Sequence, residues 1–112
     1  MANSEEVSIL AIISPKPDRI DQVLELIKDP LVAGVKAIEP GCISFHANRA
    51  TEEHTDEEEI FMIERFVNSD AIAFHQKNPA FLAFARALEE KELLQKPLYI
   101  KIVKPVAGFV RN

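Results

Sequence analysis

The stretch VSILAII, residues 7–13, restricts the fold of this chain more than any other segment. It is apolar apart from Ser8, and it is rich in β-branched side chains. A run of this length is too short to span a membrane, and its composition favours an extended backbone. The prolines of the following SPKP segment end it. We therefore expect a buried strand, and the rest of the chain must supply a sheet around it.

Two helical segments follow from the spacing of apolar residues. In residues 17–29, apolar side chains stand at i, i+3, i+4 and i+7, which predicts an amphipathic helix. These residues are Ile20, Val23, Leu24 and Ile27. Pro30 interrupts it, and we expect a second piece to restart there with Asp29 as its N-cap. The second segment, residues 69–96, predicts a long helix that ends before Pro97.

Three further strands are predicted at residues 42–50, 60–68 and 98–106. The order is then strand, helix, strand, strand, helix, strand. This order predicts an α+β fold of the ferredoxin-like, split βαβ type, with a four-stranded antiparallel sheet and both helices on one face. We expect a single domain over residues 7–106, with a flexible tail at 1–6 and a C-terminal tail at 107–112.

The strands are apolar on both faces, which an antiparallel sheet with one solvated face would not be. In the strand at 60–68, one face carries Ile60, Met62, Glu64 and Phe66, and the other carries Phe61, Ile63, Arg65 and Val67. An exposed apolar face of this kind marks an interface. The sequence predicts a homodimer in which the open sheet faces pack together, with Arg65 in a structural role on that side.

Charge and cysteine content exclude several classes of function. The net charge is −5 and the basic residues form no stripe, so no nucleic-acid partner is expected. The lone cysteine, Cys42, permits no intrachain disulfide and is interpreted as a packing residue; together with the absence of a signal-like segment it predicts a cytoplasmic protein without membrane contact. The acidic run at 52–59 is interpreted as a solvated loop rather than a cation site.

No glycine-rich phosphate loop, zinc-ligand spacing or nucleophile elbow occurs in the sequence. We therefore expect no metal and no cofactor. An enzyme built on this chain would work with side chains, its substrate and dioxygen.

The segment FVNSDAIAFHQKNPAFLAF, residues 66–84, contains a histidine and a proline within a predicted helix. Proline at position 79 cannot donate to the carbonyl of His75, four residues earlier, so the helix must kink there or restart with Asn78 as cap. A kink would present His75 to a gap, with Phe74 and Phe81 as walls. The alternative is two short helices joined by a turn, with His75 at the surface.

The segments EPGCISFHANRA, IFMIERF and SDAIAFHQKNPAF resemble the antibiotic biosynthesis monooxygenase family over residues 7–105. The resemblance implies a dimeric α/β barrel and an oxygenase without metal or flavin, which oxidises phenols, anthrones or quinols with dioxygen. It also implies a pocket that includes Glu64, Phe66 and His75. Phe66 stands where the family commonly has tryptophan, and Ala11 stands where haem-degrading relatives have asparagine, so haem degradation is not expected.

The candidate catalytic residues are His75, which would accept a proton, and Glu64, which would orient it or form a structural ion pair. The other candidates for a substrate pocket are Phe66, Met62, Phe74, Phe81, Phe84, His46 and Asn48. His46 and Asn48 share a predicted strand face and could instead be polar contacts of the dimer.

Three functions fit these residues. The first is a monooxygenase of secondary metabolism that acts on a hydrophobic, electron-rich small molecule of the phenol, quinol or polyketide type. The second is a dimer that binds a small molecule without turnover. The third is an isomerase, lyase or cyclase that uses His75 as acid and base without oxygen.

Overall fold

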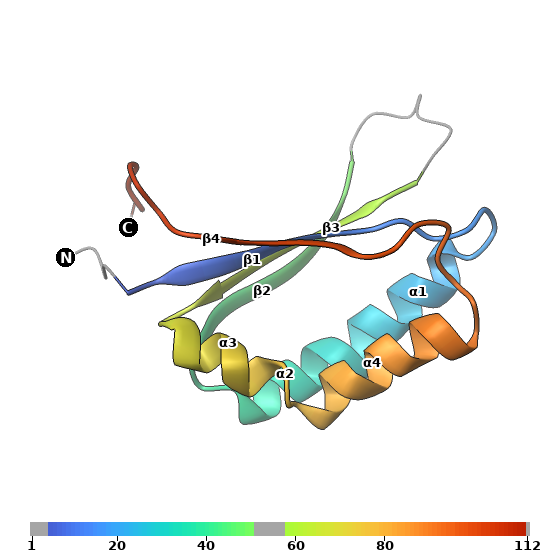
Figure 1. Ribbon diagram of the computed structural model, residues 1–112, viewed down its shortest axis with the longest axis horizontal. Helices are drawn as coiled ribbons and strands as arrows, with labels where there is room; N and C mark the ends of the chain where they lie inside the picture. Colours follow the sequence, from blue (N-terminus) through green and yellow to red (C-terminus); the bar gives the residue numbers. More distant parts are fainter. Residues whose placement is uncertain (1–4, 51–57, 112) are drawn as a thin grey trace.

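A computed structural model describes residues 5–50 and 58–111 of the chain. It has two layers, a sheet and a set of helices that all cover one face of that sheet (Figure 1). The sheet is antiparallel with the strand order β2-β3-β1-β4, which confirms the ferredoxin-like topology. The strands are β1 (Val7–Ile13), β2 (Cys42–Arg49), β3 (Ile60–Phe66) and β4 (Tyr99–Val103).

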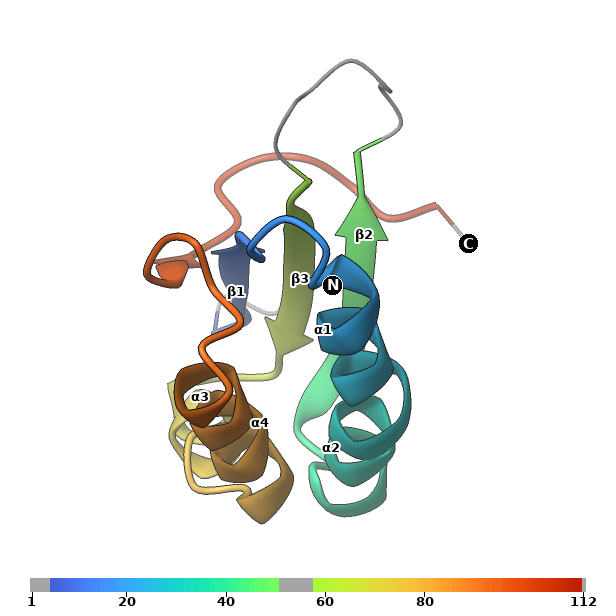
Figure 2. The same cartoon turned by 90° about the vertical axis from the view of Figure 1, so that its right-hand side faces the viewer.

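The helices form two rows beneath the sheet (Figure 2). One row contains α1, the π-helical turn η1 and α2, and the other contains α3 and α4. Their bounds are α1 (Ile20–Leu26), η1 (Ile27–Leu31), α2 (Val32–Ile38), α3 (Ser69–His75) and α4 (Pro79–Glu90).

The first helical row does not restart at Pro30, so the prediction of a break there was wrong. The backbone continues through η1, where the Val32 N–H donates to the carbonyl of Ile27, five residues earlier. A proline cannot supply the usual i to i−4 bond, and a widened π turn carries the helix past it. This turn keeps Ile27 and Leu31 on the buried side of the row.

The second helical row does break at the Asn-Pro dipeptide. The side chain of Asn78 accepts from the Ala80 N–H at 2.8 Å, so Asn78 is the N-cap of α4 and Pro79 its first residue. The backbone N–H of Asn78 donates to the His75 carbonyl at 3.0 Å, which closes the turn between the helices. The break therefore leaves the His75 carbonyl and the Ala80 N–H with hydrogen-bond partners.

Helix α4 ends at Glu90. The sequence predicted an end near residue 96, so that prediction was wrong. Glu92 adopts a left-handed backbone with φ of 49°, and the Leu93 N–H donates to the carbonyl of Leu88 at 3.0 Å. This is a Schellman termination, which usually contains glycine at the left-handed position. It turns Leu93 into the core, where the side chain is fully buried.

A β-bulge in β2 interrupts the alternation of inward and outward side chains along this strand. Cys42 pairs with Phe66 and Ser44 pairs with Arg65, so Ile43 is the extra residue. Beyond the bulge Phe45 faces the helices, together with its partner Glu64. His46 and Asn48, which the sequence placed on one face of the strand, both lie on the outer face of the sheet.

The N-terminal tail is anchored at its last residue. Glu6 accepts two hydrogen bonds from the Arg65 guanidinium, at 2.9 and 3.0 Å, which gives Arg65 the structural role expected of it. Most of the acidic run lies outside the described residues. Of its end, Glu58 forms an exposed ion pair with Arg49 at 3.4 Å, and Glu59 accepts from the Ser14 hydroxyl at 3.3 Å.

The close approach of α2 to α4 depends on Gly34, because a methyl group there would overlap that of Ala80. We expect Gly34→Ala to lower the free energy of unfolding by about 1–3 kcal/mol through overpacking, measured by urea denaturation. Ala80→Gly in the same chain should restore part of the loss. A Gly34→Ala protein as stable as the parent would contradict this packing.

Candidate functional site

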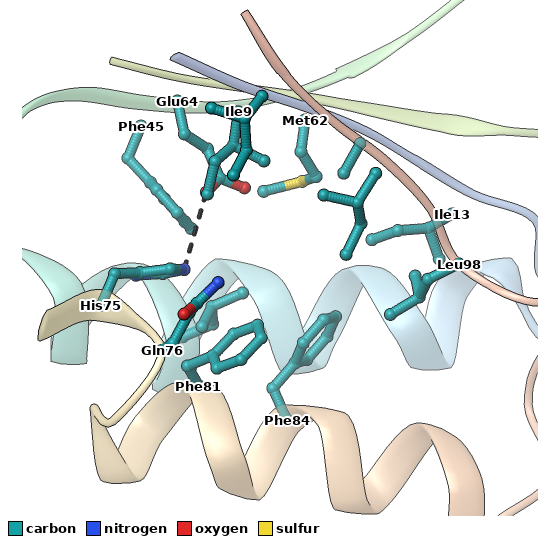
Figure 3. Close-up of a pocket in the computed structure, with 14 residues that line it drawn as sticks. Ile9, Ile13, Phe45, Met62, Glu64, His75, Gln76, Phe81, Phe84 and Leu98 are labelled. Atoms are coloured by element: carbon teal, nitrogen blue, oxygen red, sulfur yellow. Dashed lines mark ion pairs between the residues drawn. The ribbon is translucent and has the colours of Figure 1, made fainter. Parts of the chain in front are cut away.

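A small cavity of about 70 Å³ lies between the inner face of the sheet and the two helical rows (Figure 3). Its walls are almost entirely apolar, and the polar groups in its lining are Glu64, His75 and Gln76. The lining residues are Ile9, Ala11, Ile13, Leu31, Phe45, Met62, Glu64, His75, Gln76, Phe81, Phe84, Leu98, Ile100 and Ile102. An apolar pocket with a few convergent polar groups is typical of a small-molecule site.

His75, the last residue of α3, faces this cavity and not solvent. Its side chain is buried, with the whole residue 2% exposed. Three phenylalanine rings surround the imidazole, with centroids at 5.8 Å for Phe45, 5.4 Å for Phe66 and 4.8 Å for Phe81. The structure therefore combines the two alternatives: the helices are separate, as in the second, but the histidine lies inside, as in the first.

The Nδ1 atom of His75 lies 3.0 and 2.9 Å from the two carboxyl oxygens of Glu39. Glu39 comes from the turn after α2 and is buried. One of its oxygens also accepts from the Asn78 side-chain amide at 2.7 Å. A buried carboxyl group is thus fully engaged by two nitrogen atoms from the other helical row.

The opposite nitrogen of the ring, Nε2, faces Glu64 across a gap. The distance from Nε2 to Glu64 Oε1 is 3.6 Å, too long for a hydrogen bond (dashed line in Figure 3). Glu64 is 5% exposed, and within the described part of the chain its Oε1 is a buried side-chain atom without a hydrogen-bond partner. An atom in the cavity, to one side of the line between Nε2 and Oε1, could lie at hydrogen-bond distance from both.

The protonation of Glu64 follows from its surroundings. Burial, and secondly the nearby charge of Glu39, raises the pKa of Glu64 to about 8. At neutral pH its carboxyl group is therefore largely protonated and can donate a hydrogen bond. The two carboxyl groups of the site therefore have different surroundings. Glu39 lies within hydrogen-bond distance of side-chain nitrogens, whereas Oε1 of Glu64 has no hydrogen-bond partner among the described residues.

Several sequence-predicted pocket residues are where they were expected. Met62, Phe81 and Phe84 line the cavity. Phe66 is fully buried and packs against the His75 ring without lining the cavity. Ala11 also lines the cavity.

Three other predicted pocket residues, Phe74, His46 and Asn48, do not line the cavity. Phe74 is 51% exposed and borders a shallow surface depression with Pro40 and Asp70, because successive helical residues point about 100° apart. His46 and Asn48 are exposed on the outer face of the sheet, where the bulge in β2 turns them. The Asn48 amide donates to the Phe61 carbonyl at 2.9 Å.

Sequence reasoning missed Glu39, Phe45 and Gln76 as site residues, and it treated Asn78 only as a helix cap. Glu39 lies in a turn, where a charged residue is ordinarily solvated, so nothing local marks it. The inward direction of Phe45 could not be predicted from strand alternation, because the bulge at Ile43 changes which residues of β2 face the helices. Gln76 adjoins His75 in the chain, and its amide points into the cavity (Figure 3).

Cys42 is partly buried, and burial raises the pKa of its thiol to about 11. The thiol donates to the Ser44 carbonyl at 3.4 Å and remains protonated. In the described residues no group of three or more His, Cys, Asp or Glu side chains is arranged to hold a metal ion. No helix in that part of the chain is long and apolar enough to cross a membrane.

The sequence matches the family model described as antibiotic biosynthesis monooxygenase over residues 7–87. A structure from Caulobacter crescentus, provisionally described as such an enzyme, has a TM-score of 0.80 at 22% identity and covers 93% of this chain and 92% of its own. A Mycobacterium tuberculosis structure gives 0.77 at 23% identity, covering 92% and 97%. A Nitrosomonas europaea structure with the same provisional description gives 0.78 at 14% identity, covering 95% of each. These likenesses show a shared fold, and no curated protein matches the sequence.

The raised pKa of Glu64 predicts a pH dependence of stability. Between its ordinary value of 4.5 and about 8, folded Glu64 holds a proton that the unfolded chain releases. Raising the pH through this window therefore lowers the free energy of unfolding, by up to about 1.4 kcal/mol per pH unit. Above about 8 this group adds no further slope.

Glu64→Gln removes this titration and keeps the shape of the side chain. We expect urea unfolding of the variant to show a weaker decline in stability across this window than the parent. Taking the difference between the two proteins cancels the titration of the groups that do not interact with Glu64. Equal pH slopes would show that Glu64 ionises normally.

Proposed function

This chain belongs to the antibiotic biosynthesis monooxygenase family, and from that premise we propose that it oxidises a hydrophobic, electron-rich small molecule with dioxygen. The proposed substrate class is a phenol, a quinol or a polyketide of similar chemistry. The proposed reaction uses neither metal nor flavin, so the chain's own side chains must bind the substrate and move its proton.

One observation carries the proposal. Nε2 of His75 and the unpartnered Oε1 of Glu64 face the same point of an apolar cavity, 3.6 Å apart. Buried polar atoms without partners are rare in folded proteins, so the pair is best explained by a ligand atom that contacts both. A hydroxyl oxygen suits this position, because it can donate to Nε2 and accept from a protonated Glu64.

In the proposed first step, Nε2 accepts the hydroxyl proton of the substrate. Glu64, which is largely protonated at neutral pH, donates a hydrogen bond to the oxygen as negative charge develops on it. Neutral donors in apolar sites stabilise oxyanions strongly, because little water competes there. The two residues thus act on one atom, His75 as base and Glu64 as donor.

The resulting anion is electron-rich enough to reduce dioxygen. A carbon of the substrate forms a bond to oxygen, and the peroxide then loses water. One oxygen atom remains as a new carbonyl, the other leaves as water, and the substrate supplies both the electrons and the hydrogen atoms. The apolar walls, Met62 and Phe84 among them, exclude bulk water from the anion.

The same acid and base pair also favours a second function. A base beside a neutral acid can move a proton within a substrate, as an isomerase requires, and this needs no oxygen. Anaerobic turnover would identify that reaction, and binding without turnover would identify a ligand-binding dimer.

Oxygen uptake with a panel of single-ring quinols and anthrones tests the oxygenase. We expect turnover, and we expect His75→Ala to lower kcat by about 100-fold or more because the base is lost. Phe74→Ala is the matched control, since Phe74 precedes His75 in α3 but points away from the cavity. Absence of uptake with every compound, or undiminished turnover in His75→Ala, would argue against the proposal.

We also propose that two copies of the chain pair through the outer face of the sheet. Large apolar side chains are exposed on this face from three strands, namely Leu10, Ile63, Tyr99 and Val103. An exposed apolar surface on a sheet is typical of an interface between subunits. Lys101 and Arg65 lie on the same side and would border the contact.

Ile63→Glu tests this pairing, because it puts a charge at the centre of the outer face where Ile63 is 44% exposed. We expect a dimer for the parent and a monomer for the variant in sedimentation at micromolar concentration. Leu82→Glu is the control, since Leu82 is 49% exposed but lies on α4. A monomeric parent protein would refute the dimer.

A further inference from the structure

Glu39 and Asn78 form a hydrogen-bonded network with Nδ1 of His75. Glu39 and Asn78 lie on the side of the imidazole away from Glu64, and both are buried. The cavity lining includes neither of them, so they do not contact a ligand there. Glu39 contacts the ring directly, and Asn78 contacts Glu39.

The orientation of the Asn78 side-chain amide shows which atoms of this network donate and which accept hydrogen bonds. Its side-chain oxygen accepts from the Ala80 N–H at 2.8 Å, which directs its NH₂ group toward Glu39. An amide NH₂ can only donate, so the Glu39 oxygen at 2.7 Å is an acceptor. The same NH₂ group lies 3.4 Å from the Gly34 carbonyl, a second acceptor.

We infer that Glu39, held in place by Asn78, is a positioning residue that keeps a proton on Nδ1 of His75, so that Nε2 is the nitrogen that exchanges a proton with the ligand. The Glu39 carboxyl group accepts from both neighbours, and an acceptor within 3.0 Å of Nδ1 requires an N–H there. The description of Nε2 as a base rests on the proposed function; the position of the proton does not.

The surroundings of the ring also oppose a flip, which would put the Cδ2 carbon against Glu39 and the Cε1 carbon toward Glu64. The rings of Phe45, Phe66 and Phe81 enclose the imidazole, and a flip would remove one of the two hydrogen-bond partners of the buried Glu39 carboxyl group. Loss of such a partner is costly in a buried site. Glu39 therefore sets both the ring orientation, in which Nε2 faces the cavity, and the nitrogen that carries the fixed proton.

This inference explains why the chain breaks at the Asn-Pro dipeptide. Asn78 reaches Glu39 because it leaves the helix to cap α4. Its two side-chain groups then join the start of α4 to the turn that follows α2. The helix break thus supports the orientation of the proposed base.

Nitrogen-15 NMR of the imidazole distinguishes the tautomers without any substrate. Replacing His46 and His54 with glutamine leaves His75 as the sole histidine of the chain. For the neutral ring we expect nearly complete Nδ1–H, with Nε2 unprotonated. A neutral ring with its proton on Nε2 would overturn the inference, and this measurement needs no further variant to fold.

Variants then test the part played by each residue. Glu39→Gln should shift the neutral ring toward the Nε2–H form, because an amide accepts more weakly and can itself donate to Nδ1. Asn78→Ser keeps a helix-capping side chain but removes the donor to Glu39, and should give a smaller shift in the same direction. Glu25→Gln, on the exposed side of α1, is the matched control and should give none.

Unchanged tautomer ratios in both Glu39→Gln and Asn78→Ser would also overturn the inference. In an active preparation, Glu39→Gln should lower kcat with little change in KM, because the substrate contacts remain. The outcomes separate clearly: an Nδ1–H ring in a protein that oxidises no quinol would refute the proposed function and leave this inference standing.

Discussion

The contact between Glu39 and His75 is the constraint on which the arrangement of the site depends. A carboxyl group and an imidazole buried in so small a domain are tolerated only if each has a partner. Glu39 follows α2 and His75 ends α3, so their contact at 2.9 Å joins the two helical rows at one end. Asn78 adds a third attachment from the start of α4. The position of the imidazole is therefore set by three separate segments.

With the ring fixed in this way, the two carboxyl groups of the site diverge in character. Glu39 receives N–H donors and belongs to the support of the ring, whereas Glu64 meets an apolar cavity and its pKa rises. Two groups of the same type are thereby separated into an acceptor and a neutral donor. The chemistry of the cavity follows from this separation rather than from any unusual residue.

The two faces of the sheet are specialised as well. The inner face supplies Glu64 and Met62 to the cavity, and the outer face exposes Ile63 between them in sequence. Strand alternation thus lets one seven-residue strand serve the cavity on one side and the proposed subunit contact on the other. A bulge is needed only in β2, where it brings Phe45 to the inner face.

Local sequence determined the type and order of the elements, because strands and helices carry their own periodicity. It placed β1 at its observed bounds, separated the faces of β3 and indicated the break before Pro79. It also identified Glu64 and His75 as the unusual polar residues of apolar segments. Tertiary structure decided what no local pattern records: the π turn at Pro30, the bulge at Ile43, the exposure of Phe74 and the pairing of Glu39 with a histidine 36 residues away. These features depend on which groups from distant parts of the chain come into contact in the core. Those contacts decide the hydrogen-bond partner, the protonation state and the orientation of a buried side chain.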